Sequence, residues 1–149
     1  MNPPANRPIL LVEDNETHYE AMARALCQAG CSHPLVRCAD GDDALDYLYR
    51  RGRFVNADGP TRPALILLDL NLPGTGGHEV LATIKSDDEL RAIPVIVLTS
   101  LGDPGEVRRC YQSGANGFIR KRCGFDETVA TARRLNEYWF QASEVPDVF

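Results

Sequence analysis

The chain has 149 residues, of which 44% are hydrophobic and 25% charged, and its formal net charge is −5. This size suits one domain, and the composition excludes a disordered chain, a collagen-like repeat and a disulfide-stapled miniprotein. The negative charge argues against nucleic-acid binding. No apolar run approaches the ~20 residues that cross a bilayer, so we expect no membrane partner.

The N-terminus has no apolar signal core, and the five cysteines are odd in number and form no Cys-x-x-Cys pair. These features are typical of free thiols in a reducing compartment. We therefore expect a cytoplasmic protein.

Short apolar runs alternate with helical patterns along the chain. The predicted strands are Ile9–Val12, Leu35–Ala39, Ala64–Leu68, Val95–Leu98 and Gly117–Ile119. A helix is predicted after each strand: from the cap Asn15 to Gly30, over Asp42–Arg50, around Val80–Ile84, from Pro104, and after the cap Asp126. Residues 51–63 carry Gly, Pro and Asn without a period, which predicts a long loop.

Five strand–helix pairs in strict alternation predict an α/β fold with a parallel sheet. Five units are too few for an eightfold barrel, which takes about 250 residues. We expect a doubly wound sheet of five strands in the order 2-1-3-4-5 with five helices. Its ligand site should lie beyond the carboxyl ends of the strands, where strands 1 and 3 meet.

Polar residues follow the predicted strands at that rim. Glu13 and Asp14 follow the first strand, Asp69 the third, Thr99 the fourth and Lys121 the fifth. Three carboxylates at one point would repel each other, and a hard divalent cation such as Mg²⁺ would relieve the repulsion. Asp69 could then attack a phosphoryl group, with Lys121 and Thr99 contacting its oxygens. The alternative is that these are solvated loop acids and helix caps.

Four segments carry a resemblance to a known family: Leu-Leu-Val-Glu-Asp-Asn at 10–15, Leu-Leu-Asp-Leu-Asn-Leu-Pro at 67–73 with Gly77, Val-Leu-Thr-Ser at 97–100, and Phe-Ile-Arg-Lys at 118–121. With these motifs, residues 8–138 resemble a CheY-type receiver domain of two-component response regulators. The resemblance implies the flavodoxin-like (CheY-like) version of the fold. It also implies a signalling protein that catalyses only its own phosphorylation and dephosphorylation, and is otherwise no enzyme.

The resemblance assigns a role to each site residue. Asp69 matches the phosphoacceptor, and Lys121 the lysine that contacts the phosphoryl group. Asp14, Asp69 and the backbone carbonyl of Asn71 would ligate Mg²⁺ or another divalent cation, with Glu13 acting through a metal-bound water. Thr99 and the aromatic Phe118 match the two residues of the conformational switch, although a plain core Phe is the alternative for Phe118.

The chain departs from the family pattern at one position. Receivers usually follow the lysine with proline, often through a cis bond, whereas Arg122 follows Lys121 here. Because a cis non-proline bond costs ~2.5–4 kcal/mol, we predict a trans bond or a rearranged loop.

The resemblance also suggests an organisation and partners. We expect an N-terminal extension (1–7), a receiver domain (8–140) and a C-terminal tail (141–149) too short for an output domain. The loop at 51–63 and the aromatic tail are similar to those of small receivers that partner phytochrome kinases. The implied partners are a sensor histidine kinase, with a bacteriophytochrome as a candidate, and a phosphotransfer protein or other downstream target. The residues Tyr138, Trp139, Phe140 and Phe149 suggest a homodimer through the last two helices or the tail, unless this tail folds back on its own core.

The residues at these positions disfavour three other functions. A phosphohydrolase with an aspartyl-phosphate intermediate would need a second aspartate two residues after the nucleophile, where this chain has Asn71. A receiver that never takes phosphate is disfavoured by the complete set of Asp14, Asp69, Thr99 and Lys121. A flavodoxin is disfavoured because clustered acids would repel the phosphate of FMN, and no dinucleotide-binding or Walker motif is present.

Overall fold

The computed structural model describes residues 7–56, 62–100 and 102–147. Its centre is a five-stranded parallel sheet in the order β2-β1-β3-β4-β5. The strands are β1 (Ile9–Val12), β2 (Leu35–Cys38), β3 (Leu65–Leu68), β4 (Val95–Thr99) and β5 (Gly117–Arg120). This pairing confirms the predicted fold class and strand order. The central strands β1, β3 and β4 are buried along their whole length, which suits strands that are covered on both faces.

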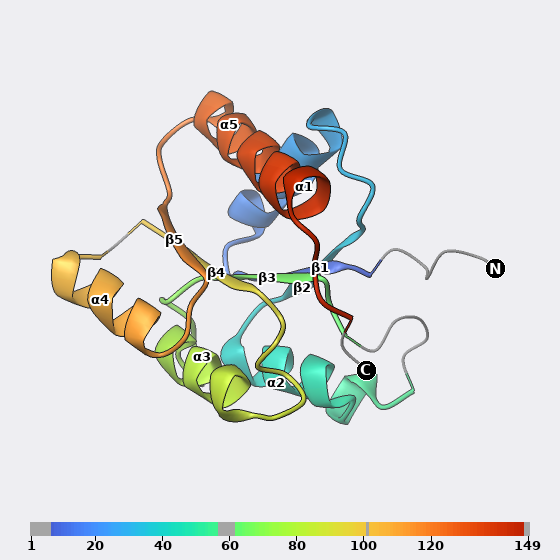
Figure 1. Cartoon of the computed structure of the whole chain (residues 1–149), viewed down its shortest axis with the longest axis vertical. Coiled ribbons are helices and arrows are strands. Elements are labelled where there is room, and N and C mark those ends of the chain that lie inside the picture. The colour runs from blue at the N-terminus through green and yellow to red at the C-terminus, as the bar shows by residue number, and fades with distance from the viewer. Residues whose placement is uncertain (1–6, 57–61, 101, 148–149) are drawn as a thin grey trace.

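Four α-helices connect successive strands, a fifth follows β5, and together they cover both faces of the sheet. They are α1 (Glu16–Gln28), α2 (Gly41–Tyr49), α3 (Gly77–Ser86), α4 (Pro104–Gln112) and α5 (Phe125–Asn136). Helices α1 and α5 cover one face, and α2, α3 and α4 lie on the other (Figure 1). Asn15, Asp40 and Asp103 cap α1, α2 and α4 through their side chains. Every connection therefore brings the chain back to the same edge of the sheet.

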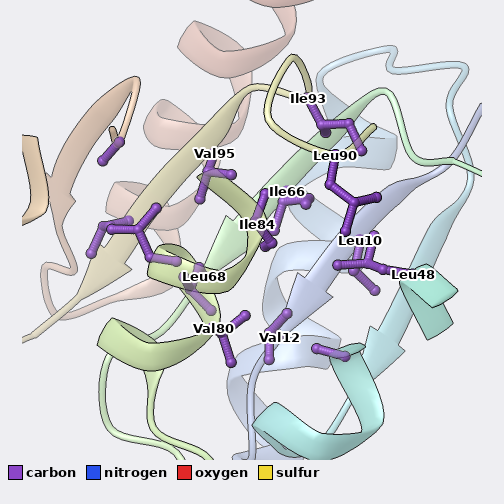
Figure 2. Packing of buried hydrophobic residues seen from close by; sticks show 14 of the residues in the cluster. Leu10, Val12, Leu48, Ile66, Leu68, Val80, Ile84, Leu90, Ile93 and Val95 are labelled. Carbon is purple, nitrogen blue, oxygen red and sulfur yellow. The ribbon is translucent and has the colours of Figure 1, made fainter. Parts of the chain in front are cut away.

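Two apolar clusters, one on each face, hold these layers together. The larger packs β1, β3 and β4 against α2 and α3, with Leu10, Ile66 and Ile84 fully buried (Figure 2). The other includes Leu11, Leu67 and Leu135 and joins the sheet to α1 and α5. Within the described residues, no helix is both long enough and apolar enough to cross a membrane.

Several local expectations are corrected by the structure. Gly124, not Asp126, stands at the N-cap position of α5, and Asp126 lies in the first helical turn. Residues 57–61 of the expected loop at 51–63 lie outside the described residues. Its described part contains a short 3-10 helix, Gly52–Phe54, whose Phe54 packs edge-on against Tyr47 of α2. No peptide bond among the described residues is cis, so the Lys121–Arg122 bond is trans, as predicted.

The segment after α5 folds back on the domain over most of its described length. It begins with a π-helical turn, Glu137–Ala142, in which Trp139 and Phe140 pack against the cluster beneath α5. Phe140 stacks on His33 at 3.9 Å between ring centroids, and the Arg7 guanidinium donates to the carbonyl of Pro146 at 2.7 Å. Tyr138 stays exposed, and Phe149 lies outside the described residues. The expected exposed aromatic tail is thus mostly covered by its own domain.

Lys85, near the end of α3, makes hydrogen bonds to the neighbouring loops. Its ammonium donates to the carbonyls of Arg91 and Ile93 at 2.9 and 2.8 Å and to Oδ1 of Asn116 at 3.0 Å. Burial lowers the pKa of Lys85 from 10.5 to about 8. Between these two values the unfolded chain binds more protons at this site than the folded one, so stability rises with pH there.

A stability measurement checks this pH dependence. We expect the free energy of unfolding of the wild type, minus that of Lys85→Met, to increase as the pH is raised from about 7 to about 10. Urea unfolding at several pH values gives this difference, and the comparison removes the titration of the tyrosines. Parallel stability profiles for the two proteins would contradict it.

Candidate functional site

The carboxyl ends of β1 and β3 bring three acidic side chains together. The backbone N–H of Glu13 donates to Cys38 at 2.9 Å, and that of Asp69 donates to Val12 at 3.1 Å. The sheet pairing thus continues one residue beyond each strand and fixes where these side chains leave it. Carboxylate oxygens of Glu13, Asp14 and Asp69 lie within 4.8 Å of one another. Glu13 and Asp69 are only 2% and 8% exposed, whereas Asp14 lies at the surface.

Arg37 of β2 holds the backbone of the acidic pair in place. Its Nε donates to the carbonyl of Glu13 at 3.0 Å, and one Nη donates to that of Asp14 at 2.9 Å. The N–H of Asn15 donates to Glu13 Oε2 at 3.3 Å, while the Asn15 side chain caps α1. The loop after β1 is therefore fixed on both sides.

Lys121 enters the cluster from the end of β5. Its backbone N–H donates to the carbonyl of Thr99 at 2.8 Å. Its ammonium donates to Glu13 Oε1 and, at 2.9 Å, to Asp69 Oδ2. Burial alone would lower the pKa of Lys121, but the hydrogen bonds to Glu13 and Asp69 raise it overall, so the ammonium stays charged.

One ammonium is shared by two largely buried carboxylates, with a third close by. Burial raises the pKa of Glu13, and the negative charge of Asp69 raises it further, against the opposing effect of Lys121. The site has more negative than positive charge, and its acidic ligand atoms are all oxygens. A hard divalent cation fits such a set better than a soft metal does.

The remaining predicted site residues surround this cluster. The N–H of Asn71 donates to Asp69 Oδ1 at 3.0 Å, which places Asn71 beside the carboxylate. Thr99 ends β4 and is fully buried. Phe118 lies opposite Val97 in the sheet and packs partly buried against the larger core cluster. Six of the seven predicted residues therefore lie at this rim of the sheet, and Phe118 lies further in along β5.

The sequence reasoning missed two residues of the site. Arg37 lies in a strand that was predicted only as a strand, and His18 lies in the first turn of α1. The Nδ1 atom of His18 is 3.2 Å from the Lys121 ammonium and 3.5 Å from Glu13 Oε1. The sequence does show that His18 follows the helix cap Asn15 by one turn, which places it near the loop after β1. Its partner Lys121, however, is 103 residues further along the chain.

A groove runs from this rim between α1 and the loop that leads into α5. Its volume is 610 Å³, and its wall includes His18, Met22, Lys121 and Phe125. It leads to the Lys121 side of the acidic cluster, so a molecule lying in it would be next to the lysine.

A parallel sheet in this order, with an acidic cluster and a lysine at its switch point, defines a receiver domain. The chain belongs to that family, because the model of the response regulator receiver domain matches residues 9–133.

Several particular relatives are similar over nearly the whole chain. The probable methanogenesis regulatory protein FilR2 of Methanothrix harundinacea is 39% identical over 138 residues, covering 93% of this chain and 86% of that protein. The response regulator Rcp1 of Synechocystis is 34% identical over 145 residues, with coverages of 97% and 95%.

Solved structures of response regulators are also similar to this chain over nearly its whole length. The phosphorylated cyanobacterial phytochrome response regulator RcpA has a TM-score of 0.87 at 36% identity, covering 96% of this chain and 100% of that one. The Mn²⁺-bound form of Rcp1 has a TM-score of 0.86 at 33% identity, with coverages of 95% and 99%. The predicted similarity to phytochrome-associated receivers is thus confirmed.

Proposed function

We propose that this protein is a response regulator that accepts a phosphoryl group on Asp69 from a sensor histidine kinase, in a reaction that requires Mg²⁺. The observation that carries the proposal is the Asp69 carboxylate, which lies within the acidic cluster and 2.9 Å from the Lys121 ammonium. A nucleophilic carboxylate beside a fixed cation is the arrangement that phosphoryl transfer needs.

The residues of this chain would share the chemistry as follows. A carboxylate oxygen of Asp69 forms a bond to phosphorus, and the bond from phosphorus to the donor atom breaks. The donor, a kinase imidazole or an acetate ion, leaves with that electron pair. Lys121 would donate an N–H to a phosphoryl oxygen and Thr99 its hydroxyl to another. Asp14, Asp69 and the Asn71 carbonyl would hold Mg²⁺, with Glu13 acting through water, and the bound ion would offset negative charge between Asp69 and the phosphoryl oxygens.

We propose that signalling follows from repacking of Thr99 and Phe118. A phosphoryl group adds about −1.5 to −2 charges and three acceptor oxygens at Asp69. Thr99 would turn toward them, and Phe118 would move into the space it leaves. The Phe118 ring is only partly buried and touches the β4–α4 loop near Gly102, where a methyl group on Gly102 would lie 2.8 Å from the ring. A shift of the Phe118 ring would therefore move the β4–α4 loop and change the position of α4.

We propose a division of the chain into an extension (1–7), the receiver unit (8–140) and a tail (141–149), and a cytoplasmic location. All five cysteines are free thiols, which suits a reducing compartment. The relatives RcpA and Rcp1 support a bacteriophytochrome as the kinase, and the groove beside Lys121 offers a surface next to the phosphoacceptor. A phosphotransfer protein or another target would receive the signal.

We propose a homodimer that uses α4, α5 and the turn after α5. Tyr111 of α4 and Tyr138 are 50% and 54% exposed, and both rings would be available to a second copy. Size-exclusion chromatography with light scattering, with and without beryllofluoride, is expected to give twice the monomer mass in at least one condition. A monomer in both would contradict the dimer.

The proposed reaction is tested by incubating the purified chain with acetyl phosphate. We expect one phosphoryl group per chain with Mg²⁺, and none when EDTA removes the metal, as measured by intact-protein mass spectrometry. Labelling that persists in EDTA, or no labelling with Mg²⁺, would contradict the proposal.

A further inference from the structure

The Lys121 ammonium has three N–H groups and three acceptors around it. Two are the carboxylates of Glu13 and Asp69, and the third is Nδ1 of His18 at 3.2 Å. The proposed phosphoryl transfer gives the carboxylates a role but leaves the imidazole without one.

The contact with Lys121 has one hydrogen-bonding arrangement. An ammonium can only donate, so Nδ1 offers its lone pair to the ammonium, with the ring proton on Nε2. Among the described residues, the other polar side-chain atom near Nδ1 is Glu13 Oε1, which is further away at 3.5 Å. The backbone of His18 is held as well, because its N–H donates to Asn15 Oδ1 at 3.1 Å in the first turn of α1. An imidazole nitrogen therefore lies at a defined place beside the Lys121 ammonium.

Exposure distinguishes His18 from the other two acceptors. The side chain of His18 is 52% exposed, against 3% for that of Glu13 and 10% for that of Asp69. His18 thus covers Lys121 on the side of the groove, where water would otherwise take the third N–H. A lysine side chain has many rotamers, so an acceptor at its tip helps to keep it in one conformation.

We propose that His18 is a positioning residue that holds the Lys121 ammonium over Asp69 while the phosphoryl group arrives. This inference rests on the proposed function. As Asp69 bonds to phosphorus it loses negative charge, and Lys121 can pass that N–H to a phosphoryl oxygen while Glu13 and His18 keep the other two. Unlike a third carboxylate, an imidazole adds no negative charge beside the incoming anion.

Three variants separate the acceptor from the bulk of the ring. His18→Leu removes the acceptor and keeps an apolar side chain of similar size. His18→Asn places an amide oxygen close to where Nδ1 lies. Thr17→Val is the matched control, because Thr17 is in the same helical turn and lines the same groove.

The rate of labelling by acetyl phosphate at saturating Mg²⁺ is the first measurement. We expect His18→Leu to label about fivefold more slowly, as for the loss of one ordinary hydrogen bond, since the contact is long and half exposed. His18→Asn and Thr17→Val should stay within about twofold of the wild type. The Mg²⁺ concentration that half-saturates the rate should not change. In a Lys121→Met background, His18→Leu should have no further effect, since the two residues act together.

A second measurement does not depend on labelling. Long-range ¹H–¹⁵N NMR of the imidazoles should show His18 with its proton on Nε2, and Lys121→Met should shift the Nδ1 resonance. If the wild type labels and His18→Leu labels at the same rate, the inference is wrong and the proposed function stands. If the wild type does not label at all, both fail, and the NMR spectra still decide whether the contact exists.

Discussion

Asp69→Asn is expected to abolish phosphoryl labelling, with a loss of more than about a hundredfold that mass spectrometry would record as an unmodified chain. An amide oxygen is a poor nucleophile. Whichever way the amide turns, its nitrogen would face a donor, either the Lys121 ammonium or the N–H of Asn71, where an acceptor stands now. The fold should persist, because the change removes one negative charge from a crowded acidic cluster.

A matched variant shows that the loss belongs to this carboxylate. Asp103 follows β4 at the same rim and caps α4 by accepting from the N–H of Glu106 at 2.8 Å. Asparagine caps a helix as well as aspartate does, so Asp103→Asn should fold and label like the wild type. Labelling of Asp69→Asn at the wild-type rate would remove Asp69 as the phosphoacceptor.

Gly77→Ala is expected to lower the free energy of unfolding by about 3 kcal/mol and to slow labelling. A Cβ atom at Gly77 would lie 2.4 Å from the carbonyl oxygen of Asp69 and 2.5 Å from Cα of Leu70. These are backbone atoms, and they cannot move without shifting the phosphoacceptor itself. Urea unfolding gives the stability, and acetyl phosphate labelling gives the rate.

The neighbouring glycine is the control for this prediction. A Cβ atom at Gly76 would meet nothing within 4 Å, and its φ of −71° suits any residue. Gly76→Ala should therefore lower the free energy of unfolding by no more than about 1 kcal/mol, the cost of alanine at the N-cap of α3, and leave labelling intact. Equal stabilities for the two variants would show that α3 can move away from Asp69 without loss.

The fold could be predicted because its signals are local. Four apolar residues in succession between polar or turn-forming segments, as in Ile9–Val12, favour a buried strand, and each strand is followed by a helical pattern. Element boundaries depend on backbone geometry that the pattern does not show. Asp126 has the chemistry of a helix cap, but α5 begins directly after Gly124, whose positive φ of 98° favours glycine.

The acidic cluster and the lysine were also predictable, because parallel strands end at one edge of the sheet. Once the strand order places β1 beside β3, residues that follow them must be neighbours, and the spacing of Asp69, Thr99 and Lys121 matched a known family. The aromatic tail was harder to interpret. Trp139 and Phe140 are apolar whether they face a partner or their own core, and composition does not distinguish the two.

The sequence by itself determined the order of strands and helices and the chemical types gathered at one rim, since both follow from local patterns and from the geometry of a parallel sheet. Only the tertiary structure decided which side chains touch. His18 meets Lys121 because α1 packs against α5, which follows β5 after a short loop, and Arg7 meets Pro146 because the last turn folds back across the domain. Such contacts depend on how helices and loops pack in three dimensions, and no periodicity along the chain records them.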